Sequence, residues 1–174
     1  RLFLRGYGDD CIFPHTIAPP AEVDFHRKRF EVARAFGFNY VRHHSWWPPE
    51  EYFEAADETG FLLQPEFPIA YLPFYQRAGE EARKLTVTEW RRAIRRSRTH
   101  PSVISYCMGN EIWGGVDMAP DLYRIAKDLD PTRLVVSSDG APLPVAAILE
   151  ARPPADIFSC QFDDWGKFGW RDGK

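Results

Sequence analysis

The chain has 174 residues, of which 44% are hydrophobic, 15% aromatic and 27% charged, and its net charge is −3 from 22 basic and 25 acidic residues. This composition is typical of one soluble globular domain and excludes a disordered or collagen-like chain. The near-neutral charge gives no electrostatic reason to expect nucleic acid or an anionic membrane as a partner. No apolar run approaches the ~20 residues that span a bilayer, so we expect no membrane partner either.

The sequence opens at Arg1 without a methionine and without the long apolar core of a signal peptide. We therefore expect a processed N-terminus or a segment of a longer polypeptide, and the cellular location stays open. Cys11, Cys107 and Cys160 are an odd number of cysteines without CxxC or Cys/His metal spacing. Neither a disulfide framework nor a metal site is expected.

Short apolar segments alternate with helical patterns along the whole chain, which is typical of a βα repeat. The predicted elements, in chain order, are a strand at 2–6, a helix at 22–36, a strand at 39–43, a helix at 49–60, a strand at 61–65, a helix at 86–99, a strand at 103–108, a helix at 117–129, a strand at 134–138, a weaker helix at 142–151 and a strand at 157–161.

Helix ends are signalled by residue type. The first helix stops at Gly37, and the second begins at Pro49 and closes at Gly60. Thr86 and Glu89 match a capping box at the start of the third helix. The segment 103–108 is continuously apolar in character, which is typical of a strand buried on both faces of a parallel sheet. Two architectures remain open, a doubly wound sheet and a (β/α)₈ TIM barrel.

In either architecture the chemistry lies beyond the C-terminal ends of the strands. All six predicted strands are followed there by ionisable, amide or indole groups: Asp9 and Asp10, His43 to Trp47, Glu66, Asn110 to Trp113, Asp139, and Gln161 to Trp165. Neither a GxxxxGK[ST] loop nor a GxGxxG that opens a helix is present, so no nucleotide cofactor is expected. The sequence also lacks the GxSxG elbow of a serine nucleophile.

Carboxylates beside tryptophans suit glycoside hydrolysis, because a carboxylic acid must protonate the leaving oxygen and an indole can stack on a sugar ring. Trp46, Trp47, Trp113 and Trp165 fall just beyond predicted strands and are candidate stacking residues. Glu111 is the candidate catalytic residue, since it follows an apolar strand directly behind Asn110. Position alone leaves open that Glu111 is only a carboxylate near a helix N-terminus.

Other polar groups have simpler explanations. His43 and His44 point to opposite faces of a strand and no third ligand is evident, which disfavours a metal. The arginines between Arg91 and Arg98 fit the solvated face of a helix. His100 precedes Pro101 on the side away from the predicted site, so a structural role is favoured. Asp9 and Asp10 are either sugar-hydroxyl acceptors or ordinary turn residues.

Nearly the whole chain resembles the TIM-barrel domain of glycoside hydrolase family 2, which includes β-galactosidases, β-glucuronidases and β-mannosidases. The most specific match is His100-Pro101-Ser102 with the following apolar residues, and then Gly109-Asn110-Glu111 at the end of that strand. Further matches are Leu4-Arg5-Gly6, Asn39-Tyr40-Val41-Arg42, the segment Asp57 to Leu62, and Asp130-Pro131-Thr132-Arg133.

The resemblance implies a retaining mechanism in which Glu111 is the general acid/base, Asn110 bonds the sugar 2-hydroxyl, and Arg42 orients the nucleophile carboxylate. Glu66 has a counterpart in the family, although Gln64-Pro65-Glu66 replaces the usual Asp-Glu after the third strand. The histidine after the second strand is shifted relative to the family's pattern. One of His43 and His44 is either a substrate-contacting donor or a packed core histidine, and His44 is the candidate for substrate binding.

In the family the nucleophile follows strand seven, so we expect residues 1–174 to be an incomplete barrel of about six βα units. This fragment would be inactive on its own and would belong to a larger multidomain chain.

Two hypotheses of different classes follow. The first is a retaining β-glycosidase, whose partner is a glycoside, an oligosaccharide or a polysaccharide. The second is a non-catalytic carbohydrate-binding protein that keeps the barrel and its aromatic rim. A doubly wound hydrolase or transferase is a third possibility. The sugar, the linkage and the oligomeric state are not indicated by the sequence.

Overall fold

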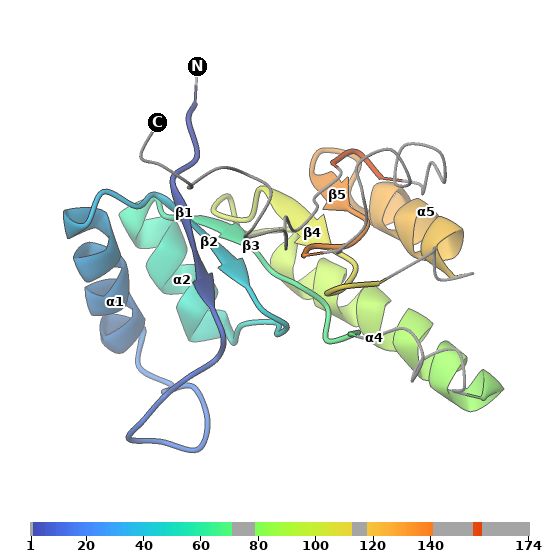
Figure 1. The fold of residues 1–174 in the computed structure, drawn as a ribbon, viewed down its shortest axis with the longest axis horizontal. Helices are drawn as coiled ribbons and strands as arrows, with labels where there is room; N and C mark the ends of the chain where they lie inside the picture. The colour runs from blue at the N-terminus through green and yellow to red at the C-terminus, as the bar shows by residue number, and fades with distance from the viewer. Residues whose placement is uncertain (1, 71–78, 113–117, 141–154, 158–174) are drawn as a thin grey trace, which may run out of the picture.

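The computed structural model describes residues 2–70, 79–112, 118–140 and 155–157 (Figure 1). Their strands and helices alternate as the sequence predicts. In chain order they are β1 (Gly6–Asp9), α1 (Val23–Ala35), β2 (Tyr40–His43), α2 (Glu50–Thr59), β3 (Leu62–Gln64), α4 (Glu80–Ser97), β4 (Ser105–Cys107), α5 (Ala119–Leu129) and β5 (Leu134–Val136).

All the described strands are parallel and follow one another in sequence order. β2 pairs with β1 and β3, and β4 pairs with β5. Isolated bridges from Leu63 to Val103 and from Glu66 to Cys107 join the two sheets. A doubly wound sheet reverses its strand order at a switch point, and the described strands show no such reversal. The fold is that of a TIM barrel, present as a partial barrel that is not closed within the described residues.

The pleat of β2 separates the two faces of the sheet. Val41 and His43 are fully buried against the helices, whereas Tyr40 and Arg42 point to the opposite, barrel-interior face. Gly6, the partner of Tyr40, makes room for this arrangement, because a Cβ at Gly6 would lie 2.5 Å from Cδ1 of the Tyr40 ring. The interior face of β2 therefore carries Arg42 towards the barrel axis.

The helices bury the outer face of the sheet. Figure 1 shows α1 and α2 beside β1 and β2, with α4 and α5 beside β4 and β5. The rings of Phe30 on α1 and Phe61 before β3 stack with centroids 4.8 Å apart, and both side chains are fully buried. Trp90 of α4 is equally buried and donates its indole N–H to the Leu122 carbonyl at 2.9 Å. These buried contacts between the helices and the sheet hold the strands in place.

The bounds of two predicted elements were wrong. The first strand is Gly6–Asp9 rather than 2–6, so these residues form the strand instead of following it. The Asn39 side chain bonds the Arg5 amide and the Phe3 carbonyl in place of a strand neighbour. The third helix begins at Glu80 rather than Thr86. Thr86 lies inside this helix, where its hydroxyl donates to the Ala82 carbonyl at 2.8 Å, so the apparent capping box does not cap.

The last predicted elements fall mostly outside the described residues. The helix at 142–151 lies there entirely, and of the strand at 157–161 only Ile157 is described, which bridges in parallel to Val136. That bridge has the direction expected for a sixth barrel strand. Across the described part of the chain, no helix combines the length and apolar character needed to cross a membrane.

Candidate active site

Arg42 is the centre of a charged cluster on the interior face of the sheet. Its guanidinium lies 3.0 Å from Oε2 of Glu66 and 3.1 Å from Oδ2 of Asp139. Nη2 also donates to Oδ1 of Asn110 at 2.6 Å. Burial alone would lower the pKa of Arg42, but the hydrogen bond and charge of Glu66 outweigh it and hold the pKa above its ordinary value. Three of the predicted site residues, Arg42, Glu66 and Asn110, are therefore in contact.

Glu66 is a fully buried carboxylate just beyond β3. Burial raises its pKa above the ordinary value, against the opposing effects of Arg42 and of the Ser45 hydroxyl, which donates to Oε1 at 2.6 Å. A buried charge of this kind persists only with partners on both oxygens. Ser45 and Arg42 provide them, so Glu66 is a fixed anion that anchors Arg42.

Asn110 carries an unused donor. The side chain is 1% exposed, and its Nδ2 has no hydrogen-bond partner among the described residues. Because a guanidinium only donates, the atom of Asn110 that faces Arg42 must be the amide oxygen, and the NH₂ group then points the other way. Native structures rarely leave a buried donor unpaired, so such a donor marks a place for a ligand or water.

Glu111 follows Asn110 in a strained backbone conformation, with φ of 49°, that non-glycine residues seldom adopt. Hydrogen bonds pin the backbone on both sides of it. The Glu111 amide donates to the Asp139 carbonyl at 2.8 Å, and the Ile112 amide donates to the Ser138 hydroxyl at 2.8 Å. The half-buried side chain of Glu111 thus starts from a backbone that the neighbouring strand holds in place.

Gly109 permits this turn because the chain passes close to its neighbours. A Cβ at Gly109 would lie 2.3 Å from Cδ1 of Ile112 and 2.5 Å from the carbonyl oxygen of Ile69. The second contact is with backbone and cannot be relieved by a rotamer change. The Gly-Asn-Glu sequence is therefore explained at each position by the structure.

Asp10 and His44 form a second polar pair at the same end of the strands. The His44 Nδ1 lies 3.0 Å from Oδ1 of Asp10, and the side chains are 38% and 59% exposed. Asp9, by contrast, is buried, where Arg29 and the Tyr52 hydroxyl bind its Oδ2 at 3.1 Å and 3.0 Å. Of the two aspartates that follow the first predicted strand, only Asp10 is accessible to a ligand.

The tryptophans expected to stack on a sugar have different outcomes. Trp46 is 9% exposed, donates its indole N–H to the Asp9 carbonyl at 2.8 Å and packs edge-on against Phe13, His43 and Tyr52. Its ring faces are used in the core, which argues against sugar stacking at this position. Trp113 and Trp165 lie outside the described residues.

Two further residues belong to the cluster. The sequence places Asp139 among the polar groups that follow the strands but assigns no role to it or to Gln64. Asp139 follows β5, and Gln64 closes β3; the Gln64 amide donates to Oδ2 of Asp139 at 2.8 Å. Gln64 Oε1 in turn accepts hydrogen bonds from Tyr40 at 2.7 Å and Ser105 at 3.1 Å. The position of Asp139 at a strand end is a usable sequence signal, whereas the contact across 75 residues of chain is not.

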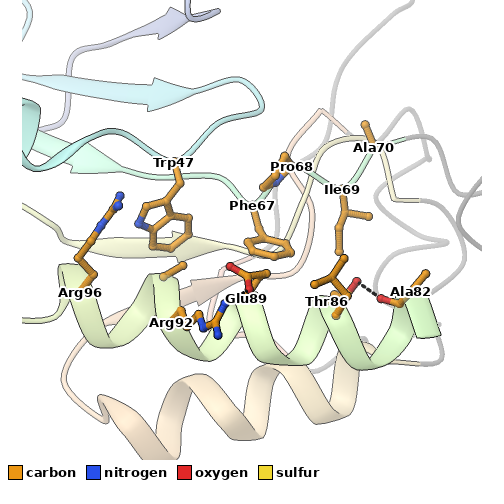
Figure 2. A pocket seen from close by; sticks show the side chains of 12 residues that line it. Trp47, Phe67, Pro68, Ile69, Ala70, Ala82, Thr86, Glu89, Arg92 and Arg96 are labelled. Atoms are coloured by element: carbon orange, nitrogen blue, oxygen red, sulfur yellow. Dashed lines mark hydrogen bonds and ion pairs between the residues drawn. The ribbon is translucent and has the colours of Figure 1, made fainter. Parts of the chain in front are cut away.

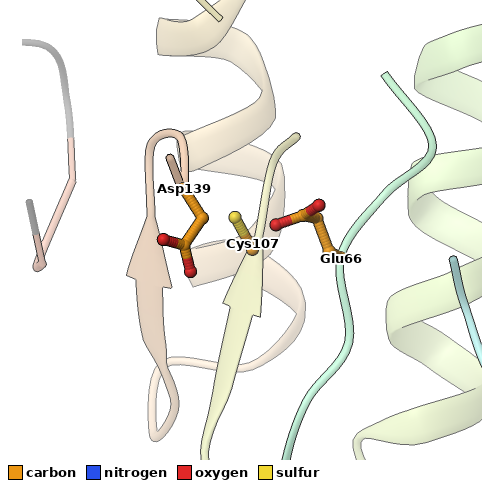
Figure 3. A group of neighbouring side chains, drawn as sticks. All are labelled: Glu66, Cys107 and Asp139. Carbon is orange, nitrogen blue, oxygen red and sulfur yellow. The ribbon is translucent and has the colours of Figure 1, made fainter. Parts of the chain in front are cut away.

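Three side chains in and beside the cluster could in principle bind a metal ion. Figure 3 shows Glu66 and Asp139 on either side of Cys107, and one ligand atom from each lies within 4.8 Å of the others. Arg42 already pairs with both carboxylates, and the Cys107 thiol donates to the Gly109 carbonyl at 3.3 Å. Burial raises the pKa of that thiol far above its ordinary value, so it stays protonated. The donor set thus fits the arginine better than a metal ion.

A groove of about 770 Å³ lies between α4 and the segments that follow β2 and β3, and its described lining does not include the residues of the charged cluster. Figure 2 shows Trp47, Phe67 and Ile69 facing α4 across this groove, with Glu89 and Arg92 on the helix. Because Trp47 and Phe67 follow strands, the groove opens at the same end of the sheet as the charged cluster. Trp47 stacks on Tyr106 at a centroid distance of 6.0 Å, which fixes its ring as one wall.

Comparison with known proteins agrees with this arrangement. Residues 21–159 match the family model described as "Glycosyl hydrolases family 2, TIM barrel domain". A putative beta-glucuronidase of Formosa agariphila is 31% identical over 121 residues, which make up 67% of this chain and 11% of that protein. Beta-galactosidase 2 of Enterobacter cloacae is 30% identical over 119 residues, with shares of 66% and 11%. The chain thus spans about a tenth of these relatives.

Solved structures share the fold. A glycosyl hydrolase family 2 member from Bacteroides cellulosilyticus superimposes with a TM-score of 0.74 at 25% identity, over 92% of this chain and 21% of that one. Bacteroides uniformis beta-glucuronidase 2, covalently bound to cyclophellitol-6-carboxylate aziridine, gives a TM-score of 0.74 at 21% identity, over 91% and 20%. At 21% identity the second likeness concerns the fold alone.

Proposed function

Because the chain belongs to glycoside hydrolase family 2 and forms part of its TIM barrel domain, we propose that it supplies the acid/base half of a retaining β-glycosidase active site. The observation that carries this proposal is the Nδ2 of Asn110, a buried donor next to Glu111 that has no hydrogen-bond partner within the described part of the chain. A buried donor held ready beside a carboxyl group is what a polyhydroxylated substrate requires. The strained backbone at Glu111 points to the same place.

Glu111 is the general acid in this proposal. It protonates the glycosidic oxygen as the bond to the sugar breaks, and as a carboxylate it then takes a proton from the water that releases the sugar. Asn110 Nδ2 donates to a sugar hydroxyl, the 2-hydroxyl by the family resemblance. Such a hydrogen bond strengthens as the ring becomes an oxocarbenium-like transition state.

The retaining mechanism needs a second carboxylate ~5–5.5 Å from the first as nucleophile. By the family resemblance this glutamate follows strand seven, so we place it in residues outside this chain. Arg42 would orient that carboxylate as well as Asn110, since its side chain is 24% exposed. The polypeptide that carries both carboxylates is the proposed enzyme, and the chain alone would not hydrolyse a glycoside.

Further substrate contacts are proposed at the rim. The Asp10 and His44 side chains present a carboxylate oxygen and an imidazole to hydroxyl groups. Trp113 and Trp165 are proposed as stacking residues on the strength of their sequence positions. Glu66 is proposed to contribute through Arg42, because it is fully buried and both of its oxygens accept hydrogen bonds. Trp46 is not among the proposed contacts.

The barrel is proposed to close on the far side of β1. α1 carries Phe25, Val32 and Phe36 on an exposed face, and these side chains line a groove of about 520 Å³ that reaches Tyr7 and Phe38. An apolar surface of this kind is covered in a complete TIM barrel by neighbouring βα units. Residues 1–174 would then form roughly the first two-thirds of the barrel domain in a longer chain.

The test is an assay of the full-length polypeptide with aryl β-glucuronides and aryl β-galactosides, the sugars that the relatives' names suggest. We expect Glu111→Gln to slow hydrolysis of substrates with poor leaving groups about 10²–10⁴-fold. Activated aryl glycosides need little protonation and should be affected less. Glu31→Gln changes an exposed glutamate on α1 in the same way and serves as the matched control.

Two results would contradict the proposal. An equal loss of rate on good and poor leaving groups would exclude acid catalysis by Glu111. Sugar binding detected by calorimetry without hydrolysis of the panel would favour the alternative, a carbohydrate-binding barrel that does not catalyse hydrolysis.

A further inference from the structure

Asp139 reaches the charged cluster from beyond β5, whereas Glu66 follows β3. Its Oδ2 lies 3.1 Å from Nε of Arg42 and accepts a hydrogen bond from the Gln64 amide at 2.8 Å. Its Oδ1 accepts the Gly140 amide at 2.9 Å, which ties the carboxylate to its own turn. The Asp139 carboxylate is therefore fixed at both oxygens, and one of these bonds crosses from β5 to β3.

Gln64 has no freedom to leave this contact. The side chain is 5% exposed, and its oxygen accepts hydrogen bonds from the Tyr40 and Ser105 hydroxyls at 2.7 Å and 3.1 Å. Because the oxygen faces these two donors, the amide NH₂ must face Asp139. Gln64 thus connects β2, β3 and β4 to the carboxylate that follows β5.

Arg42 depends on both carboxylates for its position. Glu66 alone contacts one edge of the guanidinium, through Nε and Nη2. Asp139 contacts the same Nε, so carboxylates that follow two different strands hold this edge of the guanidinium at once. The Nη2 that donates to Asn110 Oδ1 at 2.6 Å is thereby kept on the side of β4.

We propose that Asp139 and Gln64 are positioning residues, which hold Arg42 so that it fixes the amide of Asn110 with Nδ2 directed at the substrate. This inference rests on the proposed function, in which Asn110 contacts the sugar. It adds that the contact is set through a chain of four side chains, Gln64, Asp139, Arg42 and Asn110, that begins on β3 and ends beyond β4. Neither Asp139 nor Gln64 touches the substrate.

A double-mutant cycle in the full-length enzyme tests this chain. Asp139→Asn keeps the shape of the side chain and removes its charge. We expect it to lower kcat/KM about 10–100-fold in the wild-type background and less than about 3-fold in an Asn110→Ala background, because the effect is transmitted through Asn110. Gln64→Met, which removes the amide at similar volume, should show the same dependence on Asn110. Asp128→Asn, an exposed aspartate on α5, is the matched control.

A structural role of Asp139 would give a different result. General loosening of the barrel would lower the melting temperature and would reduce kcat/KM by the same factor in both backgrounds. Equal factors in the two backgrounds would therefore overturn the positioning role of Asp139. The proposed glycosidase function would be unaffected, because it is tested by the activity of the wild-type enzyme.

Crystal structures of the wild-type and Asp139→Asn proteins provide a readout that needs no activity. We expect the distance from Arg42 Nη2 to Asn110 Oδ1 to increase beyond the limit of about 3.5 Å for a hydrogen bond. An unchanged contact would overturn the positioning role even if the enzyme hydrolysed none of the glycosides. The glycoside assay therefore tests the proposed function, and the distance between Arg42 and Asn110 separately tests the positioning role.

Discussion

The backbone carbonyl of Asp139 accepts a hydrogen bond from the amide of Glu111 at 2.8 Å, while the Asp139 carboxylate lies 3.1 Å from Arg42. Asp139, which follows β5, therefore contacts both parts of the candidate site: the strained backbone of Glu111, the proposed acid/base, and the Arg42 side chain. The adjacent hydrogen bond from the Asp139 amide to the Gly109 carbonyl, at 3.0 Å, continues the parallel pairing past the ends of β4 and β5. Pairing beyond the regular strands is what allows Glu111 to keep a φ of 49°.

Replacement of Glu111 by glycine is expected to stabilise the protein relative to replacement by alanine. Both variants lose the carboxyl group, but only glycine adopts a positive φ without a steric penalty from Cβ. We expect Glu111→Gly to be more stable than Glu111→Ala by about 1 kcal/mol in urea unfolding. Equal stability of the two variants would show that the backbone at this position is not strained.

Replacement of Gly109 by alanine is expected to destabilise the same turn. The added Cβ would meet the Ile69 carbonyl oxygen at 2.5 Å, and the backbone would have to shift to relieve this contact. We expect a loss of about 1–3 kcal/mol in urea unfolding, together with a loss of activity through displacement of Glu111. Gly8→Ala is the control for stability, since a Cβ at Gly8 has no heavy atom within 4 Å. A Gly109→Ala protein as stable as the Gly8→Ala protein would contradict the close approach.

The sequence predicts the order of the elements well because each βα unit is marked locally. Apolar runs mark the strands, and Gly37, Pro49 and Gly60 mark helix ends that the structure places within one or two residues. The alternation of faces along β2 then brings Arg42 to the interior, so its contact with Glu66 follows from the fold class. The sequence and the fold class together are therefore enough to bring Arg42 close to Glu66 and Asn110.

Two features were not predictable in the same way. The register of β1 depends on Asn39, whose side chain replaces a strand partner for Phe3 and Arg5, and no local pattern in the apolar segment at 2–6 signals that. Trp46 turns into the core because the Asp9 carbonyl accepts its indole N–H. The same indole at a strand end could equally have faced a ligand. Such choices are made by tertiary contacts, which a single sequence does not display.

His100 is expected to stabilise the barrel at the end of the strands away from the site. Its ring nitrogens contact Asp57 at 2.7 Å and Glu50 at 2.9 Å, and the ring stacks on Phe53 with centroids 5.0 Å apart. The structural role that the sequence favours for His100 agrees with these contacts. His100→Leu keeps an apolar contact with Phe53 and removes both hydrogen bonds, so we expect a loss of about 1–3 kcal/mol in urea unfolding.

His15→Leu changes an exposed histidine and is the stability control for the His100 variant. If His100→Leu lost no more stability than His15→Leu, the contacts with Asp57 and Glu50 would be energetically neutral. Activity per folded molecule should be unchanged in the His100→Leu protein, because His100 precedes β4 whereas Asn110 and Glu111 follow it.

The stability of the protein is expected to depend on pH through His43. This side chain is fully buried; its Nδ1 contacts the Gln64 carbonyl at 3.1 Å, and its Nε2 has no hydrogen-bond partner among the described residues. Because a carbonyl only accepts, the neutral ring carries its proton on Nδ1, and protonation of Nε2 would place an unpaired charge among the rings of Trp46 and Tyr52. Burial lowers the pKa of His43 from 6.5 to about 4.

A folded-state pKa below the unfolded value means that the unfolded chain binds a proton between these two values and the folded chain does not. Stability therefore falls as the pH falls through this window, and below about pH 4 no further loss arises from this group. Between about pH 7 and about pH 5 we expect His43 to account for a loss of about 2 kcal/mol.

The measurement is urea unfolding of the wild-type and His43→Asn proteins at these two pH values. An asparagine amide can donate to the Gln64 carbonyl in place of Nδ1 and cannot titrate, so the variant should lose about 2 kcal/mol less than the wild type on acidification. Effects of the carboxylates and of His26 are common to both proteins and cancel in the comparison. An identical pH dependence of the two proteins would mean that His43 does not cause the loss of stability. The His43 ring would then bind a proton in the folded state as readily as in the unfolded chain.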